Sequence, residues 1–297
     1  MNDNNLKIIQ VSDLHFLKDG ETMYGANPVN RFRAFINDVN KNHRNADLVV
    51  ITGDIAHNGI KESYQLFKEE LKRLDLPSVI MIGNHDNREV VKAELSSVTK
   101  IDEDGFIQSS IKIKNHKLIF CDTVWDNENI NNIHEGYYCH KRVNWLEKEI
   151  LSFNSNSNII FMHHNPMNVF MKSMDNYSFN DRDQEIISKF LNKYSSKIKY
   201  LFFGHGHRPL SGKWKNVPYA SLRGLLHARE LDFDSDVENF KMEEPSYGII
   251  FVNKNNLTFH IHDFMNKGKI YEGDENYLDF PKVKMHWSQC DLLQLSF

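Results

Sequence analysis

The chain has 297 residues, of which 40% are hydrophobic, 12% aromatic and 26% charged. This apolar content excludes a largely disordered chain, and the length allows one large domain or two smaller ones with a proper core. With 36 basic against 40 acidic side chains, the net charge of −4 argues against a protein built to coat nucleic acid. The three scattered cysteines provide neither a disulfide framework nor a paired metal-binding motif, which favours a reducing compartment.

The N-terminal segment shows no targeting signal. Polar residues Met1–Asn5 precede the hydrophobic run Leu6–Val11, which is too short for the core of a signal peptide. No stretch approaches the roughly 20 consecutive apolar residues that a membrane helix needs. We therefore expect a soluble cytoplasmic protein with no membrane partner.

Strand-like and helical segments alternate in the first part of the chain. Leu6–Val11, Leu48–Ile51 and Ser78–Ile82 are short apolar runs typical of buried strands. Between them, Phe32–Val39 and Tyr64–Leu74 carry apolar residues at helical spacing. This β-α-β-α-β order predicts parallel strands joined by right-handed helical crossovers.

The second part of the chain is richer in strands. A hairpin is predicted around Asn115-His116, and a helix over about Arg182–Tyr194. The expected strands are Ile107–Ile113, Lys117–Phe120, Ile159–Met162, Tyr200–Phe203, Val217–Leu222, Tyr247–Val252 and Leu257–Ile261. We expect one α/β domain over residues 1–263 with two sheets, and a C-terminal extension over residues 264–297. The apolar and aromatic residues of the extension predict a subunit contact, and hence a homo-oligomer.

Polar side chains directly follow five of the predicted strands. The five segments are Ser12-Asp13-Leu14-His15, Gly53-Asp54, Gly83-Asn84-His85-Asp86, His163-His164 and Gly204-His205-Gly206-His207. The carboxyl ends of parallel strands gather along one edge of a sheet, where ligands bind. We therefore expect one cluster of oxygen and imidazole ligands, made of Asp13, His15, Asp54, Asn84, His163, His205 and His207.

Such a ligand set predicts two metal ions. Seven ligands exceed the four to six of one ordinary ion, and mixed nitrogen and oxygen donors favour zinc, manganese, iron or cobalt over calcium or magnesium alone. Two divalent ions held roughly 3.5–4 Å apart need a shared carboxylate. Asp54, in the middle of the set, is the candidate bridge. Each segment alone is weak, since Gly53-Asp54 and Gly83-Asn84 are also ordinary turn dipeptides.

The five segments, taken in order, resemble the signature D-x-H, G-D, G-N-H-D/E, H and G-H-x-H of the calcineurin-like metallophosphoesterases. Gly20–Gly25, His163-His164-Asn165-Pro166 and Ser221–His227 resemble the branch that contains class III cyclic nucleotide phosphodiesterases and bacterial glycerophosphodiesterases. The resemblance implies a four-layer α/β/β/α sandwich of two mixed sheets flanked by helices.

The resemblance also implies the distribution of ligands. One ion would take Asp13, His15, Asp54 and His207, and the other would take Asp54, Asn84, His163 and His205. The residues themselves leave open whether His163 or His164 is the ligand, and we choose His163 because it directly follows its strand. Tyr24, His57, His164 and His227 are the candidates for substrate binding. His43, His116, His134, His140 and His286 are predicted to be solvated surface residues.

These expectations lead to a mechanistic hypothesis. A hydroxide held by the two ions would attack a small phosphodiester, either a glycerophosphodiester or a cyclic nucleotide, in line with the leaving group. His85 would stabilise the transition-state oxygens or protonate the leaving alkoxide, and Asp86 would hold the His85 ring in the useful tautomer. The expected enzyme is a phosphoric diester hydrolase.

Three alternatives stay open. A nuclease of the same fold would need a basic groove, against which the net charge of −4 argues. A phosphomonoesterase acting on phosphoproteins would usually carry Arg residues beside the metal-binding segments, and none follows Gly53-Asp54. A scaffold that keeps the fold without catalysis, as in a retromer subunit resembling this family, tends to lose the catalytic histidine, whereas His85 is present. No stable nucleic-acid partner is expected.

Overall fold

The computed structural model describes residues 5–125, 134–153, 157–266 and 268. The chain divides into a compact unit, Met1–Met265, and a second unit, Asn266–Phe297. Nearly all of the second unit lies outside the described residues. The predicted role of the C-terminal extension in subunit contact therefore stays a prediction, and the description below concerns the first unit.

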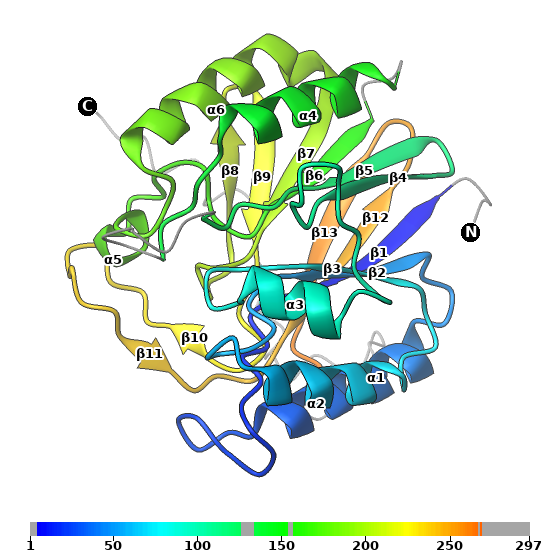
Figure 1. Cartoon of the computed structure of the whole chain (residues 1–297), viewed down its shortest axis with the longest axis vertical. Coiled ribbons are helices and arrows are strands. Elements are labelled where there is room, and N and C mark those ends of the chain that lie inside the picture. The colour runs from blue at the N-terminus through cyan, green and yellow to red at the C-terminus, as the bar shows by residue number, and fades with distance from the viewer. Residues whose placement is uncertain (1–4, 126–133, 154–156, 267, 269–297) are drawn as a thin grey trace, which may run out of the picture. The chain divides into compact units, whose positions relative to one another are not determined.

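One sheet has five strands in the order β13-β12-β1-β2-β3 (Figure 1). Their bounds are β1 (Leu6–Val11), β2 (Leu48–Thr52), β3 (Ser78–Met81), β12 (Tyr247–Val252) and β13 (Leu257–His262). The three N-terminal strands are parallel, and β12 joins β1 in the antiparallel sense. The predicted β-α-β-α-β unit is confirmed, and its strand ends meet at one edge of the sheet.

The other sheet has six strands in the order β4-β5-β6-β7-β9-β8. Their bounds are β4 (Ser109–Ile113), β5 (His116–Phe120), β6 (Asn158–Phe161), β7 (Ile198–Phe203), β8 (Leu210–Trp214) and β9 (Val217–Ser221). The predicted hairpin is the antiparallel β4–β5 pair, whereas β5, β6, β7 and β9 are parallel. Strand β8 was not predicted, because its largely exposed sequence LSGKW has no apolar run and only pairing with β9 orders it.

Helices cover the outer face of each sheet, as Figure 1 shows. On one side lie α1 (Pro28–Asn42), α2 (Lys61–Leu71) and α3 (Arg88–Glu94), and on the other lie α4 (His140–Leu151) and α6 (Asp181–Tyr194). Shorter elements are α5 (Lys172–Asp175), η1 (Ser195–Lys197), β10 (Ala228–Arg229) and β11 (Phe240–Lys241). Apolar residues fill the space between the two sheets and beneath each helical layer. The predicted four-layer α/β/β/α architecture is confirmed.

Local sequence explains where the first helix begins and what it buries. The Asn27 side chain accepts a hydrogen bond from the Asn30 N–H, and Pro28 occupies the first turn, where its missing N–H costs nothing. The predicted stripe, which includes Phe32, Phe35 and Val39, is fully buried against the sheet. Among the described helices, none is long and apolar enough to cross a bilayer.

One of the five histidines predicted to lie on the surface is instead part of a strand, and another, His286, lies outside the described residues. His116 was expected on the surface because its neighbours are polar, but it begins β5 and is only 1% exposed. Its ring contacts the Ser157 hydroxyl. Pairing of β5 between β4 and β6 therefore decided its burial, which the polar sequence around it could not reveal.

Candidate active site

The loops that follow β1, β2, β3, β6 and β7 lie together and are held by backbone hydrogen bonds. The N–H groups of Asp13 and His15 donate to the carbonyls of Gly53 and Asp54, at 3.1 and 2.9 Å. The Gly204 N–H donates to the His163 carbonyl at 3.0 Å within the six-stranded sheet. The His205 N–H donates to Asp13 Oδ1 at 3.2 Å, and this bond links the loops of the two sheets. The seven predicted ligand residues are thus brought to one place, as the strand order predicted.

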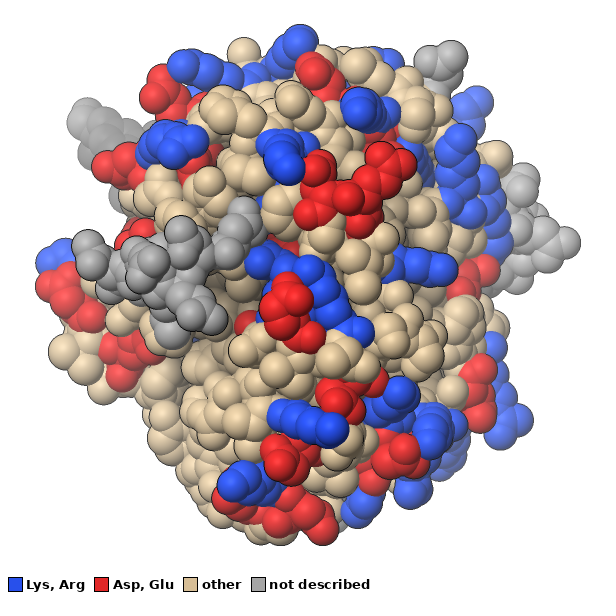
Figure 2. Space-filling model, in the orientation of Figure 1, with Lys and Arg blue, Asp and Glu red and all other residues tan. Residues whose placement is uncertain are grey.

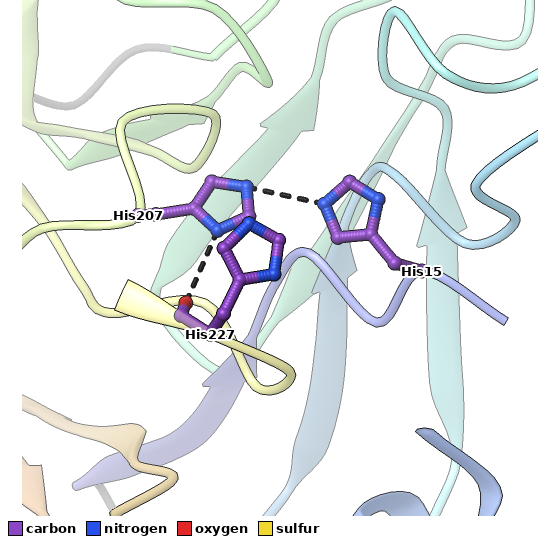
Figure 3. A group of neighbouring side chains, drawn as sticks. All are labelled: His15, His207 and His227. Atoms are coloured by element: carbon purple, nitrogen blue, oxygen red, sulfur yellow. Dashed lines mark hydrogen bonds between the residues drawn. The ribbon is translucent and has the colours of Figure 1, made fainter. Parts of the chain in front are cut away.

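Four of these residues form a close group of potential metal ligands. One ligand atom from each of Asp13, His15, Asp54 and His207 lies within 4.8 Å of the others, and all four residues are buried. The two Nε2 atoms of His15 and His207 are 3.1 Å apart (Figure 3). His207 Nε2 is 3.3 Å from Asp13 Oδ1, and His15 Nε2 is 3.7 Å from Asp54 Oδ2. Converging lone pairs of this kind fit a bound cation.

A second group meets on the other oxygen of Asp54. His163 Nε2 lies 3.4 Å from Asp54 Oδ1 and 3.1 Å from Asn84 Oδ1. The His205 ring is 5.2 Å from the His163 ring, centroid to centroid, and its Nε2 is buried with no partner among the described residues. Asp54 therefore faces both groups, one with each carboxylate oxygen.

Backbone carbonyls orient two of the imidazoles. His163 Nδ1 is 2.7 Å from the Thr52 carbonyl, and His207 Nδ1 is 3.1 Å from the His227 carbonyl (Figure 3). Because a carbonyl can only accept, each Nδ1 carries the proton, and each Nε2 points into the cluster. This arrangement is the usual way in which proteins fix the tautomer of a metal-ligating histidine.

The charge states suit metal binding. Burial disfavours the ionised Asp54 carboxylate, but His163 and His85 outweigh burial and hold its pKa well below the ordinary value. Burial and the neighbouring imidazoles lower the pKa values of His15 and His205. Burial would also lower the pKa of His163, but the Asp54 carboxylate raises it to about 9, so a cation at Nε2 must displace a proton.

Backbone strain is concentrated in this cluster. Five of the ten described non-glycine residues with positive φ are predicted ligands, namely Asp13, His15, Asp54, His205 and His207. A left-handed backbone is unfavourable for such residues and typically persists at functional sites. Glycine precedes four of the ligand residues, and close packing within the cluster explains two of these glycines. A Cβ at Gly53 would overlap the His163 ring, and one at Gly83 would overlap Asp54 and His163.

The two adjacent histidines make different contacts, although one ligand atom from each of them and one from His205 lie within 4.8 Å of one another. His163 faces Asp54 and Asn84, as described above, whereas His164 Nδ1 contacts the Thr123 hydroxyl at 2.7 Å. His164 is fully buried and is not part of the cavity wall. The cavity lining therefore gives no support to the predicted role of His164 in substrate binding, while its ring, 4.7 Å from the His205 ring, keeps it close to the proposed metal ligands.

His85 is placed as expected, but Asp86 is not. His85 lines the cavity, and its Nδ1 lies 2.8 Å from the His57 carbonyl. Asp86 instead accepts hydrogen bonds from the N–H groups of Ile55, Ala56 and Gly83 and from the Tyr64 hydroxyl. The predicted orienting role of Asp86 is thus wrong: the His57 carbonyl holds the ring, and Asp86 fixes the loop after β2. Burial, followed by the nearby Asp54, raises the pKa of Asp86 to about 6.

A cavity opens over the cluster. Tyr24, His57 and His227, three of the predicted substrate-binding residues, line it. Tyr24 and Phe240 are stacked with ring centroids 5.7 Å apart, and both rings meet His227 edge-on. Further lining residues that the sequence did not indicate are Met23, His134, Tyr177, Arg229, Glu238 and Phe240.

His134 is the most informative of these additions. It was predicted to be a solvated surface residue, but its Nδ1 is 2.9 Å from Asn84 Nδ2. The amide therefore donates to His134 and turns its oxygen towards His163. Because His134 follows no strand and belongs to no motif, only the tertiary structure shows its place.

The fold and the cluster together define a metal-dependent phosphoesterase, and comparison with known proteins identifies the family. The family profile described as "calcineurin-like phosphoesterase" matches residues 6–209. The chain belongs to this family, as its sequence segments predicted.

Three similar proteins illustrate the relationship. A probable cyclic nucleotide phosphodiesterase of Rhodopseudomonas palustris is 31% identical over 90% of this chain and 95% of its own length. A probable glycerophosphodiester phosphodiesterase of Arcobacter nitrofigilis is 31% identical over 80% of this chain and 86% of its own. The structure of a purple acid phosphatase from yellow lupin has the same fold, with a TM-score of 0.62 and 14% identity over 90% of this chain and 53% of its own.

Proposed function

We propose that the protein is a dinuclear metal-dependent phosphodiesterase that hydrolyses small phosphodiesters. The observation that carries the proposal is the convergence of seven ligand residues, six of them buried and Asn84 partly buried, at a cavity lined by imidazole and aromatic side chains. The relatives named above as cyclic nucleotide and glycerophosphodiester phosphodiesterases support this substrate class. The chain's match to nearly their full length makes the comparison relevant to the whole catalytic unit.

The two ligand groups support two ions. One ion would be held by Asp13, His15, Asp54 and His207, and the other by Asp54, Asn84, His163 and His205. Each oxygen of Asp54 faces a different group, at 3.7 Å from His15 and 3.4 Å from His163, which favours Asp54 as the bridge. The mixed nitrogen and oxygen donors fit zinc, manganese, iron or cobalt. When bound, such ions lower the pKa of water and offset the charge of a phosphate.

His85 is the proposed proton donor to the leaving oxygen. Its Nδ1 proton is held by the His57 carbonyl, which leaves Nε2 free to act in the cavity. Its backbone N–H donates to Asp54 Oδ1 at 2.9 Å, which fixes the residue relative to the cluster. The imidazole can therefore hold a proton near a substrate oxygen without being consumed as a metal ligand.

Replacement of His85 tests this role. We expect His85→Ala to keep its metal content and to lower kcat for a diester by about 10²–10⁴-fold, the usual contribution of a positioned acid or base. The matched control is His260→Ala, which removes an exposed histidine of β13. Equal turnover of wild type and His85→Ala would exclude the role.

The cavity rim supports a small substrate with a second ester arm. Tyr24 is 55% exposed at the rim and presents an aromatic surface together with Phe240. Such a surface suits the base of a cyclic nucleotide or the carbon skeleton of a glycerophosphodiester.

On the face in Figure 2, Lys and Arg are interspersed with Asp and Glu, so this face offers no basic groove for a nuclease.

One assay panel separates the remaining classes. Metal analysis should give two ions per chain, and bis(p-nitrophenyl) phosphate should be hydrolysed in the presence of Mn²⁺ or Co²⁺. Cyclic AMP, glycerophosphoethanolamine and a monoester then rank the natural substrate classes. A scaffold would show neither bound metal nor turnover, and faster hydrolysis of the monoester than of every diester would favour a phosphomonoesterase.

A further inference from the structure

An ion pair lies in the cavity wall beside the proposed metal centre. Arg229, at the end of β10, is only 3% exposed, and its Nη1 lies 2.8 Å from Glu238 Oε1. The same Nη1 donates to the Ser173 carbonyl at 3.1 Å. Glu238 comes shortly before β11, and both charged residues line the cavity. Neither residue belongs to the proposed metal ligands or to the proposed proton donor.

The pair is closely coupled to the site. The backbone N–H of Arg229 donates to the backbone carbonyl of His207, a proposed metal ligand, at 3.2 Å. The guanidinium lies 5.8 Å from the centroid of the Phe240 ring, part of the aromatic rim. The positive charge of Arg229 contributes, after burial and the neighbouring imidazoles, to the lowered pKa values of His205 and His227. Arg229 is therefore near enough to act electrostatically on a bound phosphate.

Arg229 also keeps an unused donor. Its Nε is buried and has no hydrogen-bond partner among the described residues. A buried guanidinium is costly unless it is paired, and Glu238 supplies the compensating charge. As long as both side chains are ionised, this part of the wall has no net charge, and a substrate experiences a dipole rather than a free cation.

We propose that Arg229 and Glu238 form a specificity-determining pair that disfavours dianionic phosphomonoesters relative to monoanionic phosphodiesters. This inference rests on the proposed phosphodiesterase function. Glu238 would repel the second negative charge of a monoester. It would also neutralise the Arg229 guanidinium, which would otherwise attract that charge. The interaction between two charges falls with distance and dielectric, so one added charge in a partly buried cavity changes relative binding by about tenfold.

Three variants test the proposal: Glu238→Gln, Arg229→Gln and the double variant. The metal-loaded proteins are compared by kcat/KM for bis(p-nitrophenyl) phosphate, a monoanion, and for p-nitrophenyl phosphate, a dianion at pH 8. We expect Glu238→Gln to raise kcat/KM for the monoester relative to kcat/KM for the diester by about tenfold. Arg229→Gln should change this ratio of the two kcat/KM values in the opposite direction. The double variant restores a neutral wall, so its ratio should return to the wild-type value.

Binding of inorganic phosphate provides a second readout that needs no turnover. By calorimetry, Glu238→Gln should bind phosphate about tenfold more tightly than the wild type, because a positive charge is uncovered. The matched control is Glu230→Gln on the same hairpin: Glu230 pairs with Lys241 at 3.4 Å, has a side chain 45% exposed and does not line the cavity. This control should leave both readouts unchanged.

The outcomes are distinguishable. If Glu238→Gln changes neither the ester ratio nor the phosphate affinity, the inference is overturned, whatever the behaviour of Arg229→Gln. An equal shift in the Glu230→Gln control would also overturn it, because the effect would then belong to overall charge. A wild-type protein that binds metal but hydrolyses neither ester would contradict the proposed function, while the phosphate affinity of Glu238→Gln would still decide the inference.

Discussion

Two buried polar clusters in this protein are built on opposite principles. The first is the strand-end cluster around Asp54, and the second surrounds Asp122, just after β5. Asp122 accepts two hydrogen bonds of 2.9 Å from the guanidinium of Arg88 and further bonds from the N–H groups of Ile107 and Val124. The buried Arg142 donates to the carbonyls of Asp122 and Tyr137. Each carboxylate oxygen of Asp122 is thus occupied by protein donors.

The strand-end cluster lacks this completeness. Asp13 Oδ2 and His205 Nε2 are buried without a partner among the described residues, and the Nε2 atoms of His15 and His207 face each other. Buried polar atoms in native proteins are normally satisfied, so a group of exceptions indicates a ligand. A completed network of this kind holds the fold, whereas an incomplete one that is equally buried can receive a cation.

The largest expected effect is at the centre of the incomplete network. Asp54→Asn removes the charge that faces both ligand groups, so we expect metal content to fall and diester hydrolysis to drop by about 10⁴-fold, equivalent to about 5.5 kcal/mol of transition-state stabilisation. Metal analysis, steady-state kinetics and circular dichroism would check this. A variant that keeps both ions and most of its activity would contradict the assignment of the strand-end cluster as the metal site.

The completed network should show the reverse behaviour. Asp122→Ala leaves the largely buried guanidinium of Arg88 without its carboxylate, so the free energy of unfolding should fall by about 3–5 kcal/mol. Denaturant unfolding measures this loss, and metal analysis of the folded fraction should show unchanged content. If Asp122→Ala instead lost metal at unchanged stability, the assignment of the two clusters would be reversed.

A smaller effect is expected at a residue that contacts a proposed metal ligand without binding the metal itself. His134→Ala removes the acceptor that turns the Asn84 oxygen towards His163, so the affinity for one of the two ions should fall about tenfold. Calorimetric titration of the metal-free protein with Mn²⁺ should show one weakened and one unchanged site. Equal weakening of both sites, or of neither, would contradict this positioning role.

The smallest effect concerns pH. Burial alone would raise the pKa of Asp122, but Arg142 and Arg88 outweigh burial and lower it in the folded protein. Since this value lies below the unfolded value of about 3.9, the stabilisation is present above that pH and is lost as the pH falls through the folded pKa. Metal-free wild type should therefore lose unfolding free energy more steeply below about pH 4 than metal-free Asp122→Asn. If both proteins lose unfolding free energy equally as the pH falls, ionisation of Asp122 does not contribute to the pH dependence of stability.

The sequence predicted much of the fold because its signals are local. Apolar runs such as Leu6–Val11 and the helical stripe that begins at Phe32 require burial wherever they occur, and their alternation prescribes parallel strands. Strand β8 and the β10–β11 pair escaped prediction because partners elsewhere in the chain, rather than their own residues, order them.

The candidate site also has one part that the sequence predicted and another part that it did not. The order of the strands and the polar residues directly after them determined that Asp13, Asp54, His163 and their companions would meet, because the ends of parallel strands share one edge. Only the tertiary structure decided that Asp86 fixes a loop, that His164 does not line the cavity, and that His134 and Arg229 do. Those roles depend on contacts between segments far apart in the chain, and no local pattern of residues records such contacts.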